Sequence, residues 1–297
     1  MELKERVSAV LNKKYQYLLY LPLLLVFGFT VVYPLIYSLY ISFFSYDIIR
    51  PDMTSWVGLG NYLAALSDPV VIRATINTII FILISVVLQM AVGIALALLV
   101  HKEFNKTNIL EALLLFPAFL TPIAAGFMWR WLYNPDFGLI NYLLRLVGLA
   151  GLNWVGQSST AMLSIIIVEV WRLFSFVFLL TMAGMRALPT EAFEAALVDG
   201  ANYWQTLRYV TFPYLKPVLL AVLTFRIIDG FKAFAVFYAI TGGGPGISTE
   251  ILSLQIFKQG LRYFDIGKSA ATTWLFLILL SLVAMVLIKL KFKEDTY

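Results

Sequence analysis

The segment EAFEAALVDGANYWQTLRYVTFP, residues 191–213, lies between two long apolar stretches and decides how the chain is organised. Its first half carries three acidic residues and is interrupted by Gly200, in a chain that is otherwise mostly apolar. A membrane span needs only an apolar helix of roughly 20 residues. A charged, glycine-broken helical insertion is therefore expected to lie in water beside the membrane, where another molecule can bind it.

The composition of the whole chain is that of a membrane protein. Of its 297 residues, 61% are hydrophobic and only 13% are charged, whereas soluble proteins carry about 25% charged residues. The deficit extends along the whole chain, so we expect a single transmembrane domain over residues 1–297. The net charge of +5 is attributed to uneven loop charge rather than to nucleic-acid binding. Cysteine is absent, which excludes disulfides and thiol catalysis.

Six apolar stretches are long enough to cross a bilayer. The sequence therefore predicts an all-α, polytopic membrane protein with six transmembrane helices. The predicted spans are Tyr17–Phe43, Ala74–Val100, Ile109–Tyr133, Ala161–Gly184, Pro217–Ile240 and Ala270–Leu290. We expect the first to be a span rather than a signal peptide, because its apolar run is long and no small-residue cleavage site follows. A short interfacial helix is expected within Asp136–Leu149.

The Lys and Arg residues in the loops and near the ends of the spans are distributed unevenly. Twelve lie on the side that carries both termini and the loop 186–216, and seven lie on the other side. Because cytoplasmic loops carry the excess of positive charge, both termini and this loop are predicted to be cytoplasmic. The connections Trp56–Arg73, Asn134–Thr160 and Thr241–Ser269 are then predicted to lie outside.

Two short helices are predicted in the loop 186–216. Thr190 is expected to cap the first, and Glu191 and Glu194 in its first turns are favoured by the helix dipole. Gly200 suits a left-handed helix stop, and Asn202 can begin the second helix.

Two prolines follow this pair of helices. Pro213 and Pro217 are expected to end the second helix before the next span. The simplest structural interpretation of the loop is a surface hairpin packed beneath the bundle. Its apolar contacts would be Phe193, Leu197, Trp204 and Leu207.

The spacing within the loop resembles the EAA signature of ABC importer permeases. Glu194-Ala195-Ala196 is followed after three residues by Gly200, and after nine more by Val210-Thr-Phe212-Pro213. Valine at 210 and phenylalanine at 212 are conservative departures from the family pattern. The resemblance implies that this segment is a coupling helix that docks in a cleft of a cytoplasmic ATPase. The residues to which it assigns this role are Glu194, Ala195, Ala196, Asp199, Gly200 and Pro213.

Other motifs resemble the maltose/glycerol-phosphate class of these permeases: Val57–Tyr62, Asn77-Thr78, Asn134–Asn141 and Thr241–Pro245 with Thr249-Glu250. The resemblance implies a carbohydrate importer in the cell membrane of a prokaryote. It also implies three kinds of protein partner: a second homologous permease, two copies of an ABC ATPase, and an extracytoplasmic solute-binding protein that delivers the sugar. ATP and Mg are then bound by the ATPase, and this chain is expected to hold no cofactor.

No motif in the chain indicates catalysis or metal binding. The glycine-rich run Gly242–Gly246 lacks the Lys-Ser/Thr of a phosphate-binding loop and is predicted to be a turn. No Walker-type sequence occurs, so ATP hydrolysis is expected to come from another chain. The single histidine, His101, is predicted to cap a cytoplasmic helix end rather than to bind a metal.

Five charged residues fall within the predicted fourth and fifth spans: Glu169, Arg172, Arg226, Asp229 and Lys232. Each costs ~2.5–3.5 kcal/mol at the bilayer centre unless it faces the bundle or water. The spacings of three residues allow the pairs Glu169/Arg172, Arg226/Asp229 and Asp229/Lys232.

These charges have two interpretations. They can form internal ion pairs that hold helices together, or they can line a polar passage with aromatic rings on which sugar faces stack. We assign them to a substrate pathway together with Asn77, Trp171, Phe234 and Tyr238. For Asn77, Thr78 and Gln89 the structural alternative is interhelical hydrogen bonding.

Three classes of function are compatible with a polytopic chain. A secondary transporter often shows repeat halves and does not need the motif at 194–213. An intramembrane enzyme needs a catalytic set, and none is visible. An importer permease is therefore favoured. Three positive and two negative charges in the spans nearly balance, which suits a neutral sugar or oligosaccharide. Glycerol phosphate or another polyol-type substrate is the alternative.

Overall fold

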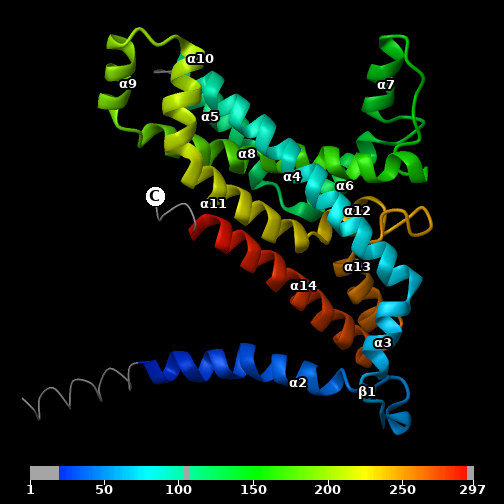
Figure 1. Cartoon of the computed structure of the whole chain (residues 1–297). Coiled ribbons are helices and arrows are strands. Elements are labelled where there is room, and N and C mark those ends of the chain that lie inside the picture. The colour runs from blue at the N-terminus through cyan, green and yellow to red at the C-terminus, as the bar shows by residue number, and fades with distance from the viewer. Residues whose placement is uncertain (1–19, 104–107, 293–297) are drawn as a thin grey trace, which may run out of the picture. The chain divides into compact units, whose positions relative to one another are not determined.

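The computed structural model describes residues 20–103 and 108–292. Five of its helices are long and apolar enough to cross a membrane, and a bent pair of helices makes a sixth span if it is counted as one. The strands in this described part are β1 (Phe44–Ser45) and β2 (Ser55–Trp56), which form a short antiparallel pair. The predicted all-α, polytopic class is confirmed (Figure 1).

The chain divides into two compact units. Unit 1 comprises residues 1–66 with 258–275, and unit 2 comprises residues 67–257 with 276–297. Within unit 1, the first span covers Tyr20–Ile41. The other elements with residues in this unit are η1 (Gly28–Val32), α2 (Tyr33–Ile41), the two strands, η2 (Pro51–Met53), α3 (Gly60–Ser67), η5 (Lys258–Arg262) and the first turns of α14 (Ile266–Phe292).

Side chains of the motif Val57–Tyr62 form hydrogen bonds with the segment that follows the first span. The amide Nδ2 of Asn61 donates to the backbone oxygens of Ser42 and Phe44 at 2.9 and 2.8 Å. The hydroxyl of Tyr62 hydrogen-bonds Ser42 Oγ at 2.6 Å. Gly58 adopts a positive φ of 53° in the turn before α3. These side chains therefore satisfy backbone groups that the irregular segment leaves free.

Unit 2 is built from the remaining helices, with α4 and α8 in extensive contact. Its elements are α4 (Pro69–Glu103), α5 (Asn108–Leu115), η3 (Phe116–Phe119), α6 (Pro122–Leu132), α7 (Leu139–Leu146), α8 (Ser158–Arg186), α9 (Thr190–Val198), α10 (Tyr203–Thr206), η4 (Leu207–Thr211), α11 (Phe212–Phe231), α12 (Ala235–Ile240), α13 (Leu252–Phe257) and the rest of α14. The side chain of His101, in the last turn of α4, lies outside the described residues, so its predicted capping role stays a prediction.

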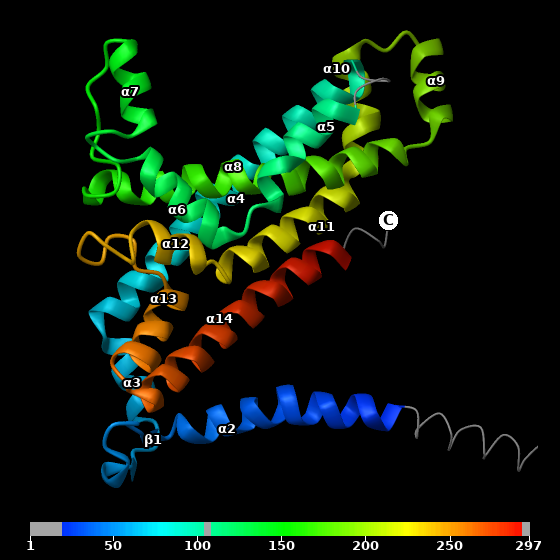
Figure 2. The same ribbon diagram turned by 180° about the vertical axis from the view of Figure 1, so that it is seen from behind.

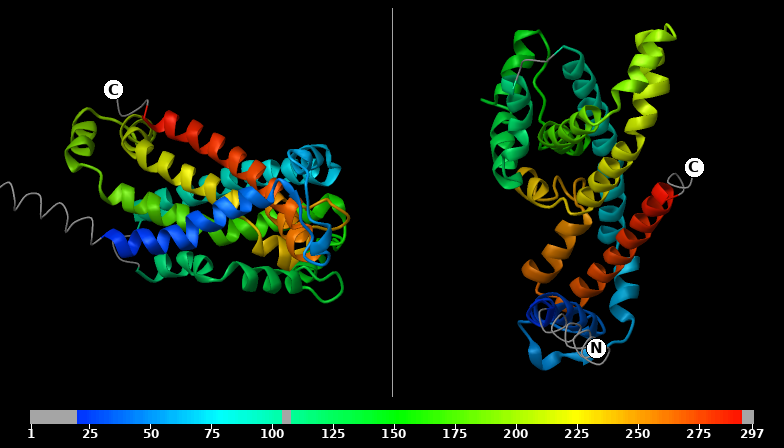
Figure 3. Two further views of the ribbon diagram at one scale, coloured as in Figure 1. Left: turned by 90° about the horizontal axis from the view of Figure 1, so that it is seen from below. Right: turned by 90° about the vertical axis from the view of Figure 1, so that its left-hand side faces the viewer.

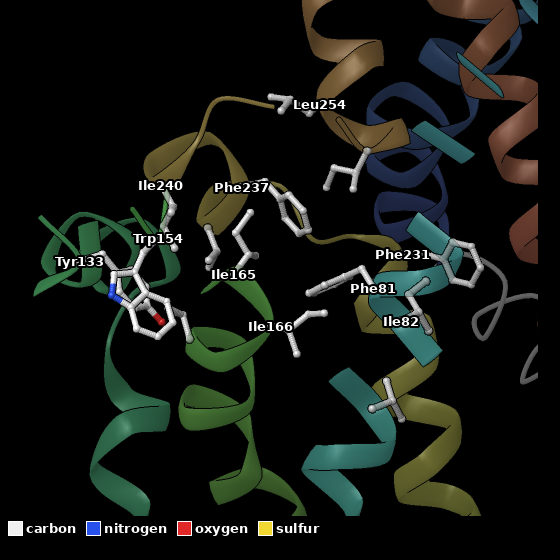
Figure 4. Close-up of a cluster of buried hydrophobic side chains, with 14 residues drawn as sticks. Phe81, Ile82, Tyr133, Trp154, Ile165, Ile166, Phe231, Phe237, Ile240 and Leu254 are labelled. Carbon is white, nitrogen blue, oxygen red and sulfur yellow. The ribbon is translucent and has the colours of Figure 1, made fainter. Parts of the chain in front are cut away.

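The core of unit 2 lies where α4, α8 and α12 meet. Phe81 of α4 meets Phe237 of α12 edge to face, with ring centroids 4.8 Å apart. Ile165 on α8 and Ile240 on α12 are fully buried beside them. Figure 4 shows the cluster reaching Tyr133 and Trp154 at one side and Phe231 at the other. A core of large apolar side chains at this junction holds α8 and α12 in fixed positions around the polar residues described below.

The third predicted span, Ile109–Tyr133, is not one straight helix. Its two halves, Ile109–Phe119 and Pro122–Leu132, meet at 95°. Thr121 has extended backbone angles, φ −62° and ψ 141°. The residue before a proline is disfavoured in the helical region, and Pro122 lacks the N–H that would continue the helix. The hydropathy of the sequence gives no sign of this break, because both halves are apolar.

The fifth predicted span, Pro217–Ile240, has the wrong bounds. The helix begins at Tyr203 and ends at Phe231, so Pro213 and Pro217 do not end the second loop helix before the span. A π-helical turn, η4, precedes Pro213, which lies in the first turn of α11, and Pro217 is inside that helix. Neighbouring helices and local π adjustments let a span accommodate proline. The predicted C-terminal part of this span, Ala235–Ile240, is the separate helix α12.

Candidate substrate passage and coupling loop

Glu169 and Arg172 form an ion pair one turn apart on α8. Arg172 donates from Nε to Oε2 of Glu169 at 3.0 Å and from Nη2 to Oε1 at 2.9 Å. Both residues are buried. The two parallel bonds match the planar guanidinium to the carboxylate, which is the geometry that offsets the cost of removing charges from water. The predicted pairing is confirmed.

A second ion pair lies on α11 and is tied to α4. Arg226 donates from Nη1 to Asp229 Oδ2 at 2.8 Å, as the spacing predicts. Its Nε donates to Oε1 of Gln89 at 2.9 Å, and Nε2 of Gln89 donates to the backbone oxygen of Glu169 at 3.3 Å. The guanidinium also lies 5.9 Å from the centre of the Phe176 ring. One polar network therefore joins α4, α8 and α11.

Lys232 does not join this network through its side chain. Its backbone N–H donates to the backbone oxygen of Asp229 at 3.0 Å, because Lys232 is the C-capping residue that follows α11. Among the described residues no ion pair joins the two side chains, so the predicted Asp229/Lys232 pair is wrong. Asp229 is already bound by Arg226. The helix ends at Phe231, so Asp229 and Lys232 do not lie on one face of a continuous helix. The Lys232 side chain is exposed.

A cavity of about 120 Å³ brings most of the predicted passage residues together. Its charged lining consists of Glu169, Arg172, Asp229 and Lys232, and Phe234 supplies an aromatic wall. Pro122, at the bend of the third span, and the start of α12 complete it. Arg226 lies behind Asp229 and is buried. The break in the third span and the end of α11 therefore expose a polar surface that straight helices would have covered.

The cavity lies well within the length of the span. Glu169 is eleven residues from Ser158, the start of α8, which places it about 16 Å along the helix at ~1.5 Å per residue. Asp229 is nevertheless half exposed, with 52% of its side-chain surface accessible. A charge facing lipid at this depth costs ~2.5–3.5 kcal/mol. This face therefore needs water or another protein chain beside it.

The predicted aromatic residues occupy different places. Phe234 stacks on Tyr238, with ring centroids 5.5 Å apart, and both rings meet Phe257 of α13. Tyr238 is exposed beside the cavity-lining Phe234. Trp171 packs edge to face against Trp129 of α6 at 5.3 Å and is not among the residues that line the cavity. Phe234 is thus the aromatic ring that reaches the charged cavity.

Asn77 and Thr78 do not line the charged cavity and are bound to the glycine-rich turn and its continuation. Nδ2 of Asn77 donates to the backbone oxygens of Ile247 and Glu250 at 3.1 and 2.8 Å. Oγ1 of Thr78 accepts from the backbone N–H of Leu252 at 3.0 Å. The predicted turn at Gly242–Gly246 is confirmed, with positive φ at three of its glycines. For Asn77, Thr78 and Gln89 the structure shows the hydrogen bonding between elements that was the structural alternative.

The loop 186–216 forms the expected helix–glycine–helix. Gly200 has φ 75°, and its N–H and that of Ala201 bond the oxygens of Leu197 and Ala196 at 3.1 and 2.9 Å. This is the hydrogen-bonded, left-handed stop that glycine permits at a helix end. The predicted left-handed stop at Gly200 is confirmed.

The second helix of the loop begins as predicted, whereas the first begins differently. Asn202 and Gln205 form a reciprocal capping box, with bonds of 3.0 and 2.8 Å. Thr190 is not the cap of the first helix, because Pro189 occupies the capping position and no side chain caps it. Proline at that position sets an extended backbone that starts the helix without a side-chain bond.

The loop exposes more of its apolar side chains than expected for a hairpin packed beneath the bundle. Of the predicted contacts, Leu207 is buried and Phe193 half-buried, whereas Leu197 and Trp204 are 73% and 74% exposed. Glu194 and Asp199 are exposed too, and Ala196 is buried. Figures 1 and 3 show the yellow-green α9–α10 hairpin standing at one end of α8. Exposed apolar side chains that gather on one loop are typical of a surface that binds another protein.

Long apolar helices, a charged cavity within the spans and an exposed helical hairpin at one end together define a subunit of a membrane transport system. Residues 62–291 match the family model described as "Binding-protein-dependent transport system inner membrane component". The chain belongs to this family. It is therefore a multi-pass inner-membrane permease subunit of an ABC importer.

Relatives in archaea and bacteria match along nearly the whole chain. The trehalose/maltose transport system permease protein MalF of Thermococcus litoralis is 34% identical over 286 residues, which cover 95% of each chain. The sulfoquinovosyl glycerol transport system permease protein SmoG of Agrobacterium fabrum is 32% identical over 91% of this chain and 86% of that protein. The arabinooligosaccharides transport system permease protein AraP of Bacillus subtilis is 32% identical over 94% of this chain and 89% of that one.

A solved structure shares the fold. A chain of a bacterial ABC transporter involved in the import of the acidic polysaccharide alginate superposes with a TM-score of 0.84 at 18% identity, over 97% of this chain and 99% of that chain. A second structure of a bacterial alginate ABC transporter, in complex with an alginate pentasaccharide-bound periplasmic protein, gives a TM-score of 0.80. At this identity the likeness concerns the fold alone.

Proposed function

We propose that this chain forms half of the translocation pathway for a sugar or oligosaccharide, which an extracytoplasmic solute-binding protein delivers. The observation that carries the proposal is the charged cavity beside α8, α11 and α12. Asp229 and Lys232 are exposed there at a depth where lipid contact is costly, so a second subunit and a hydrated passage belong on this face. The cavity, at about 120 Å³, is smaller than the ~300–1,000 Å³ of complete ligand pockets, as expected of half a site.

A neutral carbohydrate fits the charge arrangement. Arg172 and Arg226 are already bound by Glu169 and Asp229, so the polar groups offered to a ligand are largely hydrogen-bonding edges. The relatives named for trehalose/maltose and arabinooligosaccharide transport support the same class. The exposed Lys232 is the feature that favours the second candidate, an anionic polyol such as glycerol phosphate.

The energy source is proposed to be a separate ATPase, present in two copies, that docks on the loop 186–216. The exposed apolar side chains of Leu197, Val198 and Trp204 support this docking, as does the resemblance of the loop to the EAA signature. With this arrangement the loop and both termini face the cytoplasm. ATP and Mg are bound by the ATPase, and Glu194, Ala195, Ala196, Asp199, Gly200 and Pro213 transmit its movement.

Affinity purification of the tagged full-length chain from its native membrane tests the assembly. We expect a second permease with its own EAA segment and an ATPase with Walker motifs to co-purify. Reconstituted with its solute-binding protein, the complex should hydrolyse ATP faster when a neutral sugar is supplied, and glycerol phosphate is the comparison ligand. Full transport by this chain alone would refute the proposal, and stimulation by glycerol phosphate only would favour the second candidate.

A further inference from the structure

Helix α7 exposes a continuous apolar face that nothing in the described part of unit 2 covers. Its members are 50–71% exposed. They are Leu139, Tyr142, Leu143 and Leu146 of the helix and Val147, the residue that caps its C-terminal end. Spacings of three and four residues place them on one side of an α-helix. An apolar face of this kind on a surface helix needs an occupant, because leaving it in water forfeits the free energy of burial.

The opposite side of α7 is fixed to the chain that follows it. Asn141 is buried, and its Oδ1 accepts from the backbone N–H of Leu152 at 3.0 Å and from Nε1 of Trp154 at 2.9 Å. Its Nδ2 donates to the oxygen of Leu152 at 2.9 Å. The amide of one buried residue therefore sets the rotation of α7 about its axis, which decides where the apolar face points.

The direction of the apolar face follows from this rotation. Figures 1 and 2 show α7 running across the direction of α8, at the end of α8 opposite α9. The connection that contains Leu152 and Trp154 lies on the side of α7 farther from α9 (Figures 1 and 2). Asn141 points to that connection, so the opposite, apolar face points back along α8, towards the level of the spans.

The end of α8 at α7 has the features of a membrane interface. The 29 residues of α8 extend about 43 Å at ~1.5 Å per residue, which exceeds the ~30 Å hydrocarbon core. The helix begins with Ser158-Ser159-Thr160, and the exposed Trp131 lies in the last turn of α6, the second half of the bent third span. Tryptophan is enriched where the headgroups meet the acyl chains. A helix lying across the spans at this level is at the height of the headgroups.

We infer that α7 lies in the membrane surface, with its apolar face in the acyl-chain boundary of the leaflet at the Ser158 end of α8. The occupant of this face is phospholipid. An interfacial helix of this kind buries its apolar side ~5–10 Å below the headgroups. Because α7 is held by Asn141 to the connection before α8, it would fix the depth of the cavity-bearing helix in the bilayer. In the proposed orientation this is the outer leaflet.

Spin-label accessibility tests this placement directly. The natural sequence has no cysteine, so single-cysteine variants Leu143→Cys and Leu146→Cys can each carry one nitroxide. The matched control is Gln157→Cys, which is exposed at the capping position of α8 and makes no capping bond through its side chain. The labelled complexes are placed in nanodiscs of phosphatidylethanolamine and phosphatidylglycerol, and collisions with oxygen and with a water-soluble nickel chelate are compared.

We expect the labels at 143 and 146 to collide with oxygen several-fold more often, relative to the nickel chelate, than the label at 157. Nickel access equal to that of the control would show that the face is in water and would overturn the inference. An immobilised label protected from both reagents would assign the face to a protein partner, which also overturns it. The measurement requires no transport, so it is independent of the proposed substrate.

Discussion

Arg226 of α11 donates its Nε to the side-chain oxygen of Gln89 on α4, with 2.9 Å between the two atoms. This bond fixes the guanidinium so that Nη1 faces Asp229 at 2.8 Å. Gln89 also donates to the backbone oxygen of Glu169, the residue that binds Arg172. A single uncharged amide thus joins the two ion pairs, and it is fully buried.

Replacing Gln89 by methionine should destabilise the bundle. The substitution keeps the length of the side chain but leaves Nε of Arg226 without its acceptor. A buried donor left unpaired costs ~1–3 kcal/mol, and more when it is charged. Thermal unfolding of the purified complex should therefore begin at a lower temperature. Leu88→Met is the control, because Leu88 is exposed on the same helix and should change stability by less than about 0.5 kcal/mol. Equal stability of the two variants would contradict the bridging role.

Gly93 is required by the close approach of α4 to α8. A Cβ added there would lie 2.6 Å from Cβ of Val177 and 2.9 Å from the backbone oxygen of Phe174. Because both neighbours belong to the packed face of α8, Gly93→Val should cost at least the ~1–3 kcal/mol typical of overpacking. Ala95→Val, on an exposed position of the same helix, is the control. The fraction of each variant that remains monodisperse after extraction measures the effect, and equal fractions would argue against tight α4–α8 packing.

The sequence predicts the fold class because long apolar stretches are sufficient evidence of spans. It predicts both ion pairs, because a spacing of three residues brings side chains together on a helix. The bend at Pro122 and the end of α11 at Phe231 are missed, since they depend on local backbone conformation within apolar stretches. The role of Gln89 is missed for another reason. It depends on which faces of α4, α8 and α11 meet, and a single sequence does not specify that.

The left-handed conformation of Gly200 leads to a prediction about coupling. Gly200→Val should strain the turn, since a non-glycine residue in this region costs ~1–2 kcal/mol and more if β-branched. No atom lies within 4 Å of an added Cβ, so the effect should come from backbone strain and not from a clash. The variant should insert and assemble but lose substrate-stimulated ATP hydrolysis. Gly200→Asn should retain most of it, because asparagine tolerates this conformation. An equal loss of substrate-stimulated ATP hydrolysis in both variants would attribute the effect to the added side chain rather than to backbone strain.

Glu194 provides a test of the docking surface itself. It is exposed on α9, and the described residues offer it no ion-pair partner. Glu194→Lys should leave the fold intact but reverse a charge towards the ATPase, lowering the amount of ATPase that co-purifies. Glu191→Lys makes the same charge change at an exposed position in the first turn of the same helix and is the control. An unchanged amount of co-purifying ATPase in the Glu194 variant would remove this residue from the proposed interface.

The two carboxylates of the cavity should respond differently to neutralisation. Glu169 is buried and binds Arg172 through both oxygens. Glu169→Gln leaves a buried cation poorly compensated, at a cost of ~3–5 kcal/mol, so assembly should fall. Asp229 lines the cavity and has half of its side-chain surface exposed, and Arg226 keeps its bond to Gln89 when Asp229 is changed. Because Arg226 keeps this acceptor and the amide oxygen of asparagine can still accept from its Nη1, Asp229→Asn should lose less stability than Glu169→Gln and should assemble.

The altered property of Asp229→Asn should be the choice of substrate. A carboxylate at the cavity surface accepts hydrogen bonds from sugar hydroxyls, whereas an amide both donates and accepts. Uptake of several neutral sugars by the reconstituted complex should therefore change unequally, and the ratio of their rates is the quantity to measure. Asp229→Asn that fails to assemble would make the residue a structural partner like Glu169. Unchanged ratios in an assembled complex would place the substrate elsewhere in the passage.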